Sequence, residues 1–197
     1  MELKLFGIWD TSKVEVIDLG LKRYINLNPI LVPKTSGRNV KIRFHKSKNP
    51  IVERLINKLM IPGHKGKKHR LTSYRCTGKL KCYDIVKEAF KKIEKKTNVN
   101  PVSVFIKALE NSAPREEITT IEYGGARYPQ AVDCSPQRRI DIALRMMVQG
   151  AYGKSFNSKR KITDTLADEI INAYNNDNKS NAIAKKNELE RQSDSAR

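Results

Sequence analysis

Residues 100–151 read NPVSVFIKALENSAPREEITTIEYGGARYPQAVDCSPQRRIDIALRMMVQGA, and this stretch decides the fold. Asn100-Pro101 and Ser135-Pro136 each place a capping residue before a proline, which is typical of a helix start. Apolar residues recur at helical spacing after both pairs. Residues 117–132 break that rhythm and favour strands, with Gly124-Gly125 as a tight turn. The stretch therefore predicts a helix, a β-hairpin that projects from the body, and a second helix.

Further helices are predicted on both sides of this stretch. Asn49-Pro50 repeats the start signal, and an apolar stripe follows until Pro62-Gly63. A long helix is predicted from Gly78, one capped by Thr163 runs to about residue 174, and a short charged helix covers residues 182–191. The fold class is mainly α: a helical bundle with one hairpin arm at about residues 115–134.

Residues 1–48 are interpreted as an N-terminal extension to a helical domain at residues 49–197. Val14, Val16 and Leu19 alternate loosely, so residues 1–33 are expected to form short strands or turns. Residues 34–48 are expected to form an extended basic connector. Trp9, beside Phe6, is favoured as a packing anchor over a platform for stacking bases.

The formal net charge is +18, and most of it lies in one quarter of the chain. Residues 34–81 hold fifteen Lys and Arg against a single acid, whereas residues 1–33 are neutral. Such an excess favours a polyanionic partner, which removes the self-repulsion of the protein. A disordered, solvated arm is the alternative, but the apolar residues spread through the segment favour a folded basic surface that contacts phosphates. Its candidate RNA-binding residues are Lys34, Arg38, Lys41, Arg43, Lys46, Lys48, Lys65, Lys67, Lys68, Arg70, Arg75 and Lys79.

Two other basic clusters are candidates for the same surface. Arg138 and Arg139 lie in the first turn of a predicted helix, where the helix dipole disfavours cations. An external phosphate is favoured as their partner, with two solvated arginines as the alternative. The second cluster is a loop after that helix, in which Phe156 either stacks on a base or packs. Its cations are Lys154, Lys159, Arg160 and Lys161.

Catalytic and cofactor sites are not predicted. The glycine-rich loop at residues 63–68 has two residues between its glycines and no hydroxyl after its lysines, unlike a nucleotide-binding loop. His64, His69, Cys76 and Cys82 match no common zinc spacing, so no metal is expected. No nucleophile–base arrangement is recognisable. Without a signal peptide or an apolar run long enough to span a membrane, a cytoplasmic location is expected.

Several motifs, in order, resemble the small-subunit ribosomal protein seven family. They are Pro50–Leu55, Gly66–Lys68, Asn111–Glu116, Gln130–Asp133, Ser135–Arg139, Leu166–Glu169 and Lys185–Arg191. Leu5–Trp9 is similar to the archaeal and eukaryotic branch. The resemblance implies six helices with the hairpin between the third and the fourth. It also implies a structural, non-enzymatic protein that binds ribosomal RNA, nucleates assembly of the small-subunit head (the 3′ major domain), and lies near messenger RNA and exit-site transfer RNA, with other head and platform proteins as neighbours.

Carried onto this chain, the resemblance gives RNA contacts to the first basic loop, the hairpin and the helix after it. The residues are Lys65, Lys67, Lys68, Arg70, Arg115, Arg127, Arg138 and Arg139. Bacterial relatives carry more arginine in the hairpin, whereas Glu116, Glu117 and Glu122 outnumber Arg127 here. A regulator that binds DNA or messenger RNA through residues 135–153 is the second hypothesis, and an RNA-modifying enzyme is the third.

Overall fold

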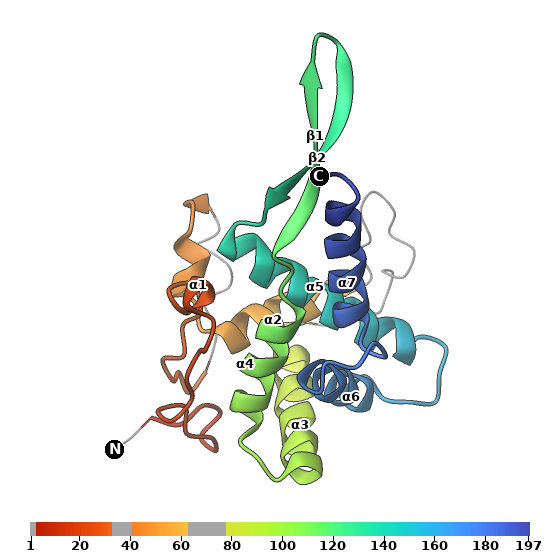
Figure 1. Ribbon diagram of the computed structural model, residues 1–197. Helices are drawn as coiled ribbons and strands as arrows, with labels where there is room; N and C mark the ends of the chain where they lie inside the picture. The colour runs from red at the N-terminus through yellow and green to blue at the C-terminus, as the bar shows by residue number, and fades with distance from the viewer. Residues whose placement is uncertain (1–2, 33–40, 63–77) are drawn as a thin grey trace.

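The computed structural model describes residues 3–32, 41–62 and 78–197, and this part of the chain is mainly helical (Figure 1). Its six longer helices are α2 (Ile51–Leu59), α3 (Lys79–Thr97), α4 (Pro101–Ser112), α5 (Pro136–Ser155), α6 (Ile162–Tyr174) and α7 (Asn181–Asp194). Strands β1 (Glu116–Tyr123) and β2 (Ala126–Asp133) pair between α4 and α5. The hairpin therefore lies between the third and fourth of these helices, which confirms the predicted fold class.

The predicted helix starts lie close to the observed ones, but their capping differs. The Asn100 side chain accepts a hydrogen bond from the Val102 amide at 3.0 Å, as a capping residue does. Ser135 occupies the N-cap of α5 without such a bond. In α2 the N-cap is Pro50 itself, so the prediction that Asn49 caps this helix is wrong.

Thr163 is also not a cap, because α6 already begins at Ile162, after Lys161. The Thr163 hydroxyl instead accepts a hydrogen bond from Lys92 Nζ of α3 at 2.8 Å. Lys92 reaches Asp164 as well, at 2.6 Å. Thr163 therefore does not cap α6 but helps to connect the first turn of α6 to α3.

The core lies where α6 packs against α3, α4 and α5. Phe90 of α3 and Phe105 of α4 are fully buried there, with their ring centroids 5.8 Å apart. Leu144 and Ile170 close the core from α5 and α6. α3, α4, α5 and α6 each contribute an apolar stripe, as the spacing of their residues predicts.

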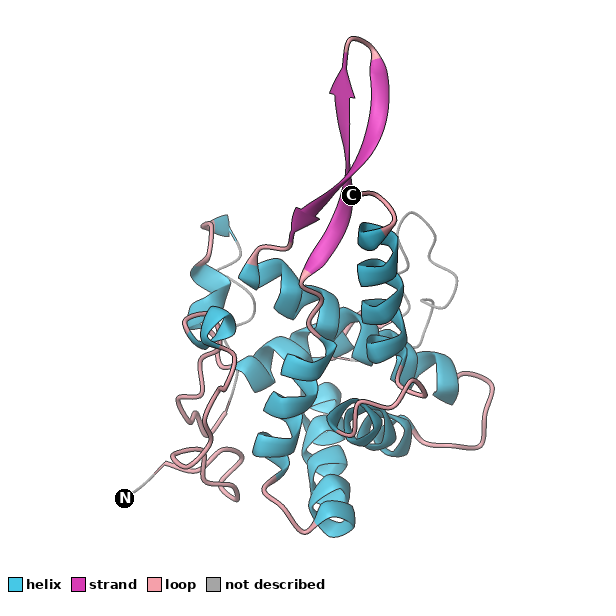
Figure 2. Cartoon of the chain, in the orientation of Figure 1, coloured by secondary structure: helices cyan, strands magenta, loops and turns pink. Residues whose placement is uncertain are grey.

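The hairpin projects from the helical body (Figure 2), and only its base contacts helices. Glu116 pairs with Asp133 at the base and Tyr123 with Ala126 at the tip. Gly124 and Gly125 have φ of 59° and 83°, a conformation that L side chains rarely adopt. The predicted turn is confirmed, since two positive φ values match the twist of a two-residue hairpin loop.

Of the strands or turns expected in residues 1–33, the described part forms turns and a short helix α1 (Leu19–Lys22). Where an extended connector was expected, the described residues include a 3-10 helix η2 (His45–Lys48). Val14 and Val16 are buried, so the alternation that suggested a strand is real. A strand, however, gives its amides to a neighbouring strand. Here the amides of Ile17 and Asp18 donate to Oε1 of Glu110 on α4, at 2.7 and 3.0 Å.

Aromatic residues join this segment to the core. Phe6 lies edge-on to Tyr83 and Phe90 of α3, with ring centroids 4.7 and 6.3 Å away. Trp9 is 4% exposed and donates its indole N–H to Glu94 at 3.0 Å. The prediction that Trp9 is a packing anchor is confirmed.

Candidate nucleic-acid interface

Part of the predicted RNA-binding set lies outside the described residues. These cations belong to the connector and to the first basic loop: Lys34, Arg38, Lys65, Lys67, Lys68, Arg70 and Arg75. The remaining members of the set lie among the described residues.

A basic groove runs between α2 and α5. It contains a pocket of about 370 Å³ in which Lys58, Arg145 and Gln149 lie beside a largely apolar lining from Ile61, Pro62 and Val148. Burial lowers the pKa of Lys58 below its ordinary value, with Asp141 opposing and Arg145 adding to that shift. An anion that enters the groove therefore stabilises the charged form of Lys58.

Asp141 of α5 lies one helical turn before Arg145 and pairs with cations from two other elements. It pairs with Arg54 of α2 at 3.1 Å and with Lys46 of η2. Burial alone would raise the pKa of Asp141, but Lys46 and Arg54 outweigh burial and hold it below the ordinary value. Asp141 thus pairs with two cations and attracts a third, Lys58, which Arg145 repels, so the region keeps a positive excess.

Residues 41–48 continue the basic surface beside α5, because Lys46 fixes η2 there. Lys41, Arg43 and Lys48 are exposed and have no carboxylate partner among the described residues. The Arg43 guanidinium lies 5.0 Å from the centre of the Phe44 ring, a cation–π contact. The Lys48 ammonium lies 3.3 Å from Nε2 of His45. Because no carboxylate of the described residues neutralises these three side chains, their charges are available to phosphates.

The second basic loop divides into paired and unpaired cations. Lys154 contacts the buried Glu169 at 2.7 Å, and Arg160 pairs with Asp168. Lys159 and Lys161 are exposed, without a carboxylate partner in the part of the chain that the structure describes. Phe156 packs beside Tyr152, with ring centroids 6.0 Å apart, as the packing alternative predicts.

This loop borders a pocket of about 380 Å³ with an apolar floor. Leu59, Ile85 and Tyr152 contribute to the floor, and Arg160 and Lys161 contribute to the rim. Pro62, three residues after the end of α2, lines both this pocket and the groove pocket, so the two are neighbours. We call this region the α2–α5 basic surface, and its cations are Lys46, Lys58, Arg145, Arg160 and Lys161. The neighbouring Arg54 is buried and pairs with Asp141.

The predicted cations at the hairpin base have partners inside the protein. Arg138 contacts Glu117 of β1 at 2.6 Å, and Arg139 contacts Asp18 at 2.8 Å and the Pro114 carbonyl at 3.1 Å. These contacts offset the cost of placing two arginines at a helix N-terminus. From the sequence, an external phosphate was expected to do so.

The other two cations of the hairpin region lie apart from the α2–α5 basic surface. Arg115 is exposed, and Arg127 lies 3.4 Å from Glu122 near the tip. Lys79, at the start of α3, forms an ion pair with Glu53, with Nζ 2.9 Å from Oε1. The hairpin itself therefore offers RNA little unpaired positive charge.

Sequence reasoning missed Arg54, Lys58 and Arg145. The signal was present, because Arg54 and Lys58 are four residues apart on one helix and Arg138, Asp141 and Arg145 follow helical spacing on another. What the spacing does not reveal is that α2 and α5 pack side by side.

Other kinds of site have no support among the described residues. No group of three or more His, Cys, Asp or Glu side chains is arranged to hold a metal there. Burial and the nearby Glu117 raise the pKa of the Cys134 thiol to about 11, which keeps it protonated and poorly nucleophilic at neutral pH. No helix in this part of the chain combines the length and the apolar character needed to cross a membrane.

Comparison with known proteins agrees with the resemblance described from the motifs. The family described as "Ribosomal protein S7p/S5e" matches residues 21–197. A small ribosomal subunit protein uS7 from Nanoarchaeum equitans is 57% identical, over the full length of both chains. The proteins of the same name from Archaeoglobus fulgidus and Methanothrix thermoacetophila are 49% and 47% identical, covering 100% and 99% of this chain and 96% and 100% of their own.

Proposed function

Because the chain belongs to the ribosomal protein S7p/S5e family, we propose that its α2–α5 basic surface binds ribosomal RNA of the small subunit. Membership makes the chain a structural constituent of the small ribosomal subunit, not an enzyme. We further propose that it nucleates assembly of the subunit head, the 3′ major domain. There the hairpin lies near messenger RNA and exit-site transfer RNA, beside other head and platform proteins.

One observation carries the RNA proposal: between α2 and α5, Asp141 pairs with Lys46 and Arg54, while Lys58 lies close enough to Arg145 to feel its charge. Ion pairs with Asp141 satisfy Lys46 and Arg54. Lys58 and Arg145 are neighbouring cations, and neither has an ion pair with a carboxylate of the described residues. A phosphate in the groove offsets their mutual repulsion. Folded RNA presents phosphates at regular intervals, so a stripe of cations from several helices fits it through shape and charge.

Exposed cations beside the stripe extend the proposed contact. Lys41, Arg43 and Lys48 border it near η2, and Lys159 borders it near the second basic loop. The cations of the predicted set that lie outside the described residues belong to the same proposal. The role of the hairpin is proposed to rest on its shape, since its only basic residue, Arg127, faces Glu122.

The test is the salt dependence of binding to a fragment of the 3′ major domain of small-subunit RNA. The variant Lys58→Gln with Arg145→Gln removes two cations from the groove. The slope of log affinity against log salt should become less steep by about one unit per lost phosphate contact. Lys91→Gln with Lys95→Gln is the matched control, because it removes two exposed cations four residues apart on α3.

An unchanged slope for the groove variant, or an equal change in the α3 control, rejects this surface as the RNA site. Circular dichroism melting confirms that both variants remain folded. Family membership does not depend on the outcome.

The alternative of a free regulator that reads duplex DNA with α5 has less support. One face of α5 is buried, with Ile140, Leu144 and Met147 in the core, and the exposed Arg138 is paired with Glu117. The match to small-subunit ribosomal proteins favours the ribosomal function. Fractionation of a cell extract on a sucrose gradient is expected to find the protein with small subunits, whereas a purely free pool contradicts the ribosomal function.

A further inference from the structure

The base of the hairpin is held by the C-terminal helix. Glu190 of α7 accepts a hydrogen bond from the Arg115 amide at 3.1 Å, immediately before β1. Arg197, at the end of the chain, pairs with Glu116 of β1. In Figure 1 the C-terminal end of α7 reaches the foot of the hairpin, and β1 and β2 both contact α7.

α7 has few apolar side chains with which to hold its own position. Its buried residues are Ala182, Ile183 and Ser193, of which two are apolar. A helix that buries so little hydrophobic surface depends on polar contacts for its docking. Lys186 supplies one of these, because its ammonium donates to the Asn111 carbonyl of α4 at 2.9 Å.

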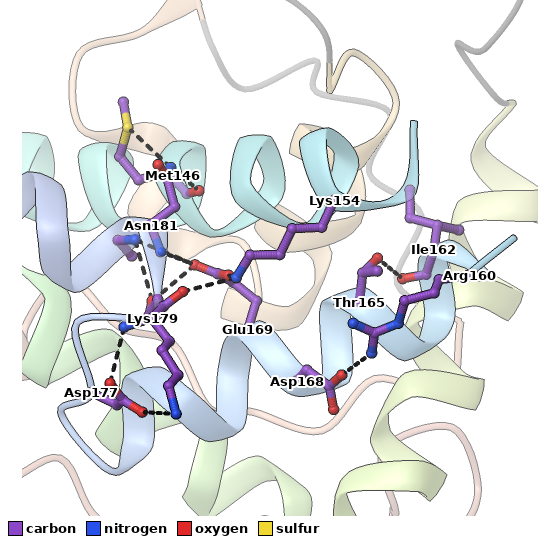
Figure 3. A network of polar contacts seen from close by, with 12 residues as sticks. Met146, Lys154, Arg160, Ile162, Thr165, Asp168, Glu169, Asp177, Lys179 and Asn181 are labelled. Atoms are coloured by element: carbon purple, nitrogen blue, oxygen red, sulfur yellow. Dashed lines mark hydrogen bonds and ion pairs between the residues drawn. The ribbon is translucent and has the colours of Figure 1, made fainter. Parts of the chain in front are cut away.

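The polar contacts at the start of α7 converge on Glu169 of α6 (Figure 3). One carboxylate oxygen accepts hydrogen bonds from the Ser180 hydroxyl, at 2.9 Å, and from the backbone amides of Asn181 and Ala182. The side chain of Glu169 is fully buried. The first turn of α7 carries no acidic residue, so α6 supplies the negative charge that a helix N-terminus favours.

Lys154 of α5 completes this arrangement. Its ammonium donates to the other oxygen of Glu169 at 2.7 Å and to the Lys179 carbonyl at 2.8 Å. Asn181 also donates to the Met146 carbonyl of α5 at 2.9 Å. A buried carboxylate is tolerated here because it has a cationic partner and several donors.

Gly150 of α5 provides an independent sign that the packing here is close. A Cβ at this position would lie 2.9 Å from Oε1 of Glu169 and 2.7 Å from Cβ of Asn181. Real Cβ atoms essentially never approach so closely, so any larger residue would push α7 away from α5. Gly153, one turn later, has no atom within 4 Å of such a Cβ.

We infer that Glu169 is a positioning residue for the hairpin: it fixes the N-terminal end of α7 against α5 and α6, and α7 in turn holds the base of the hairpin. Glu169 and Arg115 have no direct contact; the helix transmits the restraint between its two ends. The inference concerns the fold and stands whether or not the α2–α5 basic surface binds RNA.

The test is amide hydrogen exchange in the full-length protein, well below its melting temperature. Glu169→Gln keeps the size of the side chain but loses the charge that faces Lys154 and the helix N-terminus. Exchange at the start of α7 and at the Arg115 amide should rise by roughly 10-fold, because this unit opens locally, while exchange at Phe90 in the core of α3 stays unchanged.

Asp168→Asn is the matched control, since it removes the same charge from the neighbouring position of α6. Asp168 pairs with Lys96 and Arg160 near the surface and does not contact α7. Gly150→Ala should reproduce the effect of Glu169→Gln from the α5 side, and Gly153→Ala should raise exchange at neither end of α7.

Two results overturn the inference. The first is faster exchange at the start of α7 without any change at Arg115, which separates the helix from the hairpin. The second is an equal rise at Phe90, which gives Glu169 a role in global stability alone. A selective rise at both ends of α7, absent in Asp168→Asn, supports it.

Discussion

Replacing Lys79 by Met should destabilise the fold, although sequence analysis assigned this residue to RNA. Lys79 is the first residue of α3, and its Nζ lies 2.9 Å from Oε1 of Glu53 on α2. The side chain of Glu53 is 0% exposed and that of Lys79 is 15% exposed. Met preserves the length and apolar stem of Lys79 but removes the ammonium that pairs with the buried carboxylate.

The magnitude follows from the burial of the pair. Removing one partner of a buried ion pair costs about 3–5 kcal/mol, because the remaining charge stays desolvated. The partial exposure of Lys79 favours the lower end, about 3 kcal/mol. The exposed pair Arg127–Glu122 has side chains 76% and 61% exposed, and breaking it should cost at most about 1 kcal/mol.

Urea denaturation at neutral pH measures the effect in a double-mutant cycle. Lys79→Met is expected to lower the free energy of unfolding by about 3 kcal/mol. The double variant with Glu53→Met, which removes both charges, should recover most of that loss. Arg127→Gln is the exposed control. If Lys79→Met unfolds within about 0.5 kcal/mol of the parent and loses RNA affinity instead, the internal assignment of Lys79 is refuted.

Three further predictions concern stability and are checked by chemical denaturation. Asp141→Asn should destabilise the protein at neutral pH and flatten the pH dependence of its stability in acid. A carboxyl group with a lowered pKa contributes stability above its ordinary pKa of 3.8, and this stability is lost as the pH falls through the lowered pKa. An unchanged acid profile contradicts this role. Trp9→Ala should cost about 3–5 kcal/mol by leaving a cavity against α3, and a cost below about 1 kcal/mol would mean that residues 1–48 are detachable. Gly153→Ala should stabilise by about 0.5–1 kcal/mol, because alanine favours the helix and its methyl group meets no neighbour; a loss of stability counts against that reasoning.

Much of the fold follows from local signals in the sequence. Helices after Asn100-Pro101 and Ser135-Pro136 and the turn at Gly124-Gly125 lie where they were expected. Local patterns failed at Val14 and Val16, because an alternating segment becomes a strand only beside another strand. The division of the chain at residue 48 stays a prediction.

The candidate site was less predictable, because charge can be counted in a sequence whereas ion pairing depends on the tertiary structure. Arg139 pairs with Asp18, 121 residues away, and Lys154 pairs with Glu169 across two helices. Conversely, Lys58 and Arg145 were overlooked, since only the packing of α2 on α5 brings them together. The net charge indicated the class of partner, and the fold determines which cations are free to meet it.

The contact between Trp9 and Glu94 has a consequence for the order in which the chain folds during translation. These residues are 85 positions apart, so at typical elongation rates Trp9 is made roughly 4–17 seconds before Glu94. Phe6 is likewise synthesised well before its partner Phe90. A nascent chain thus carries an exposed aromatic pair near its free end until α3 has emerged, and contacts with other molecules during that interval compete with native packing.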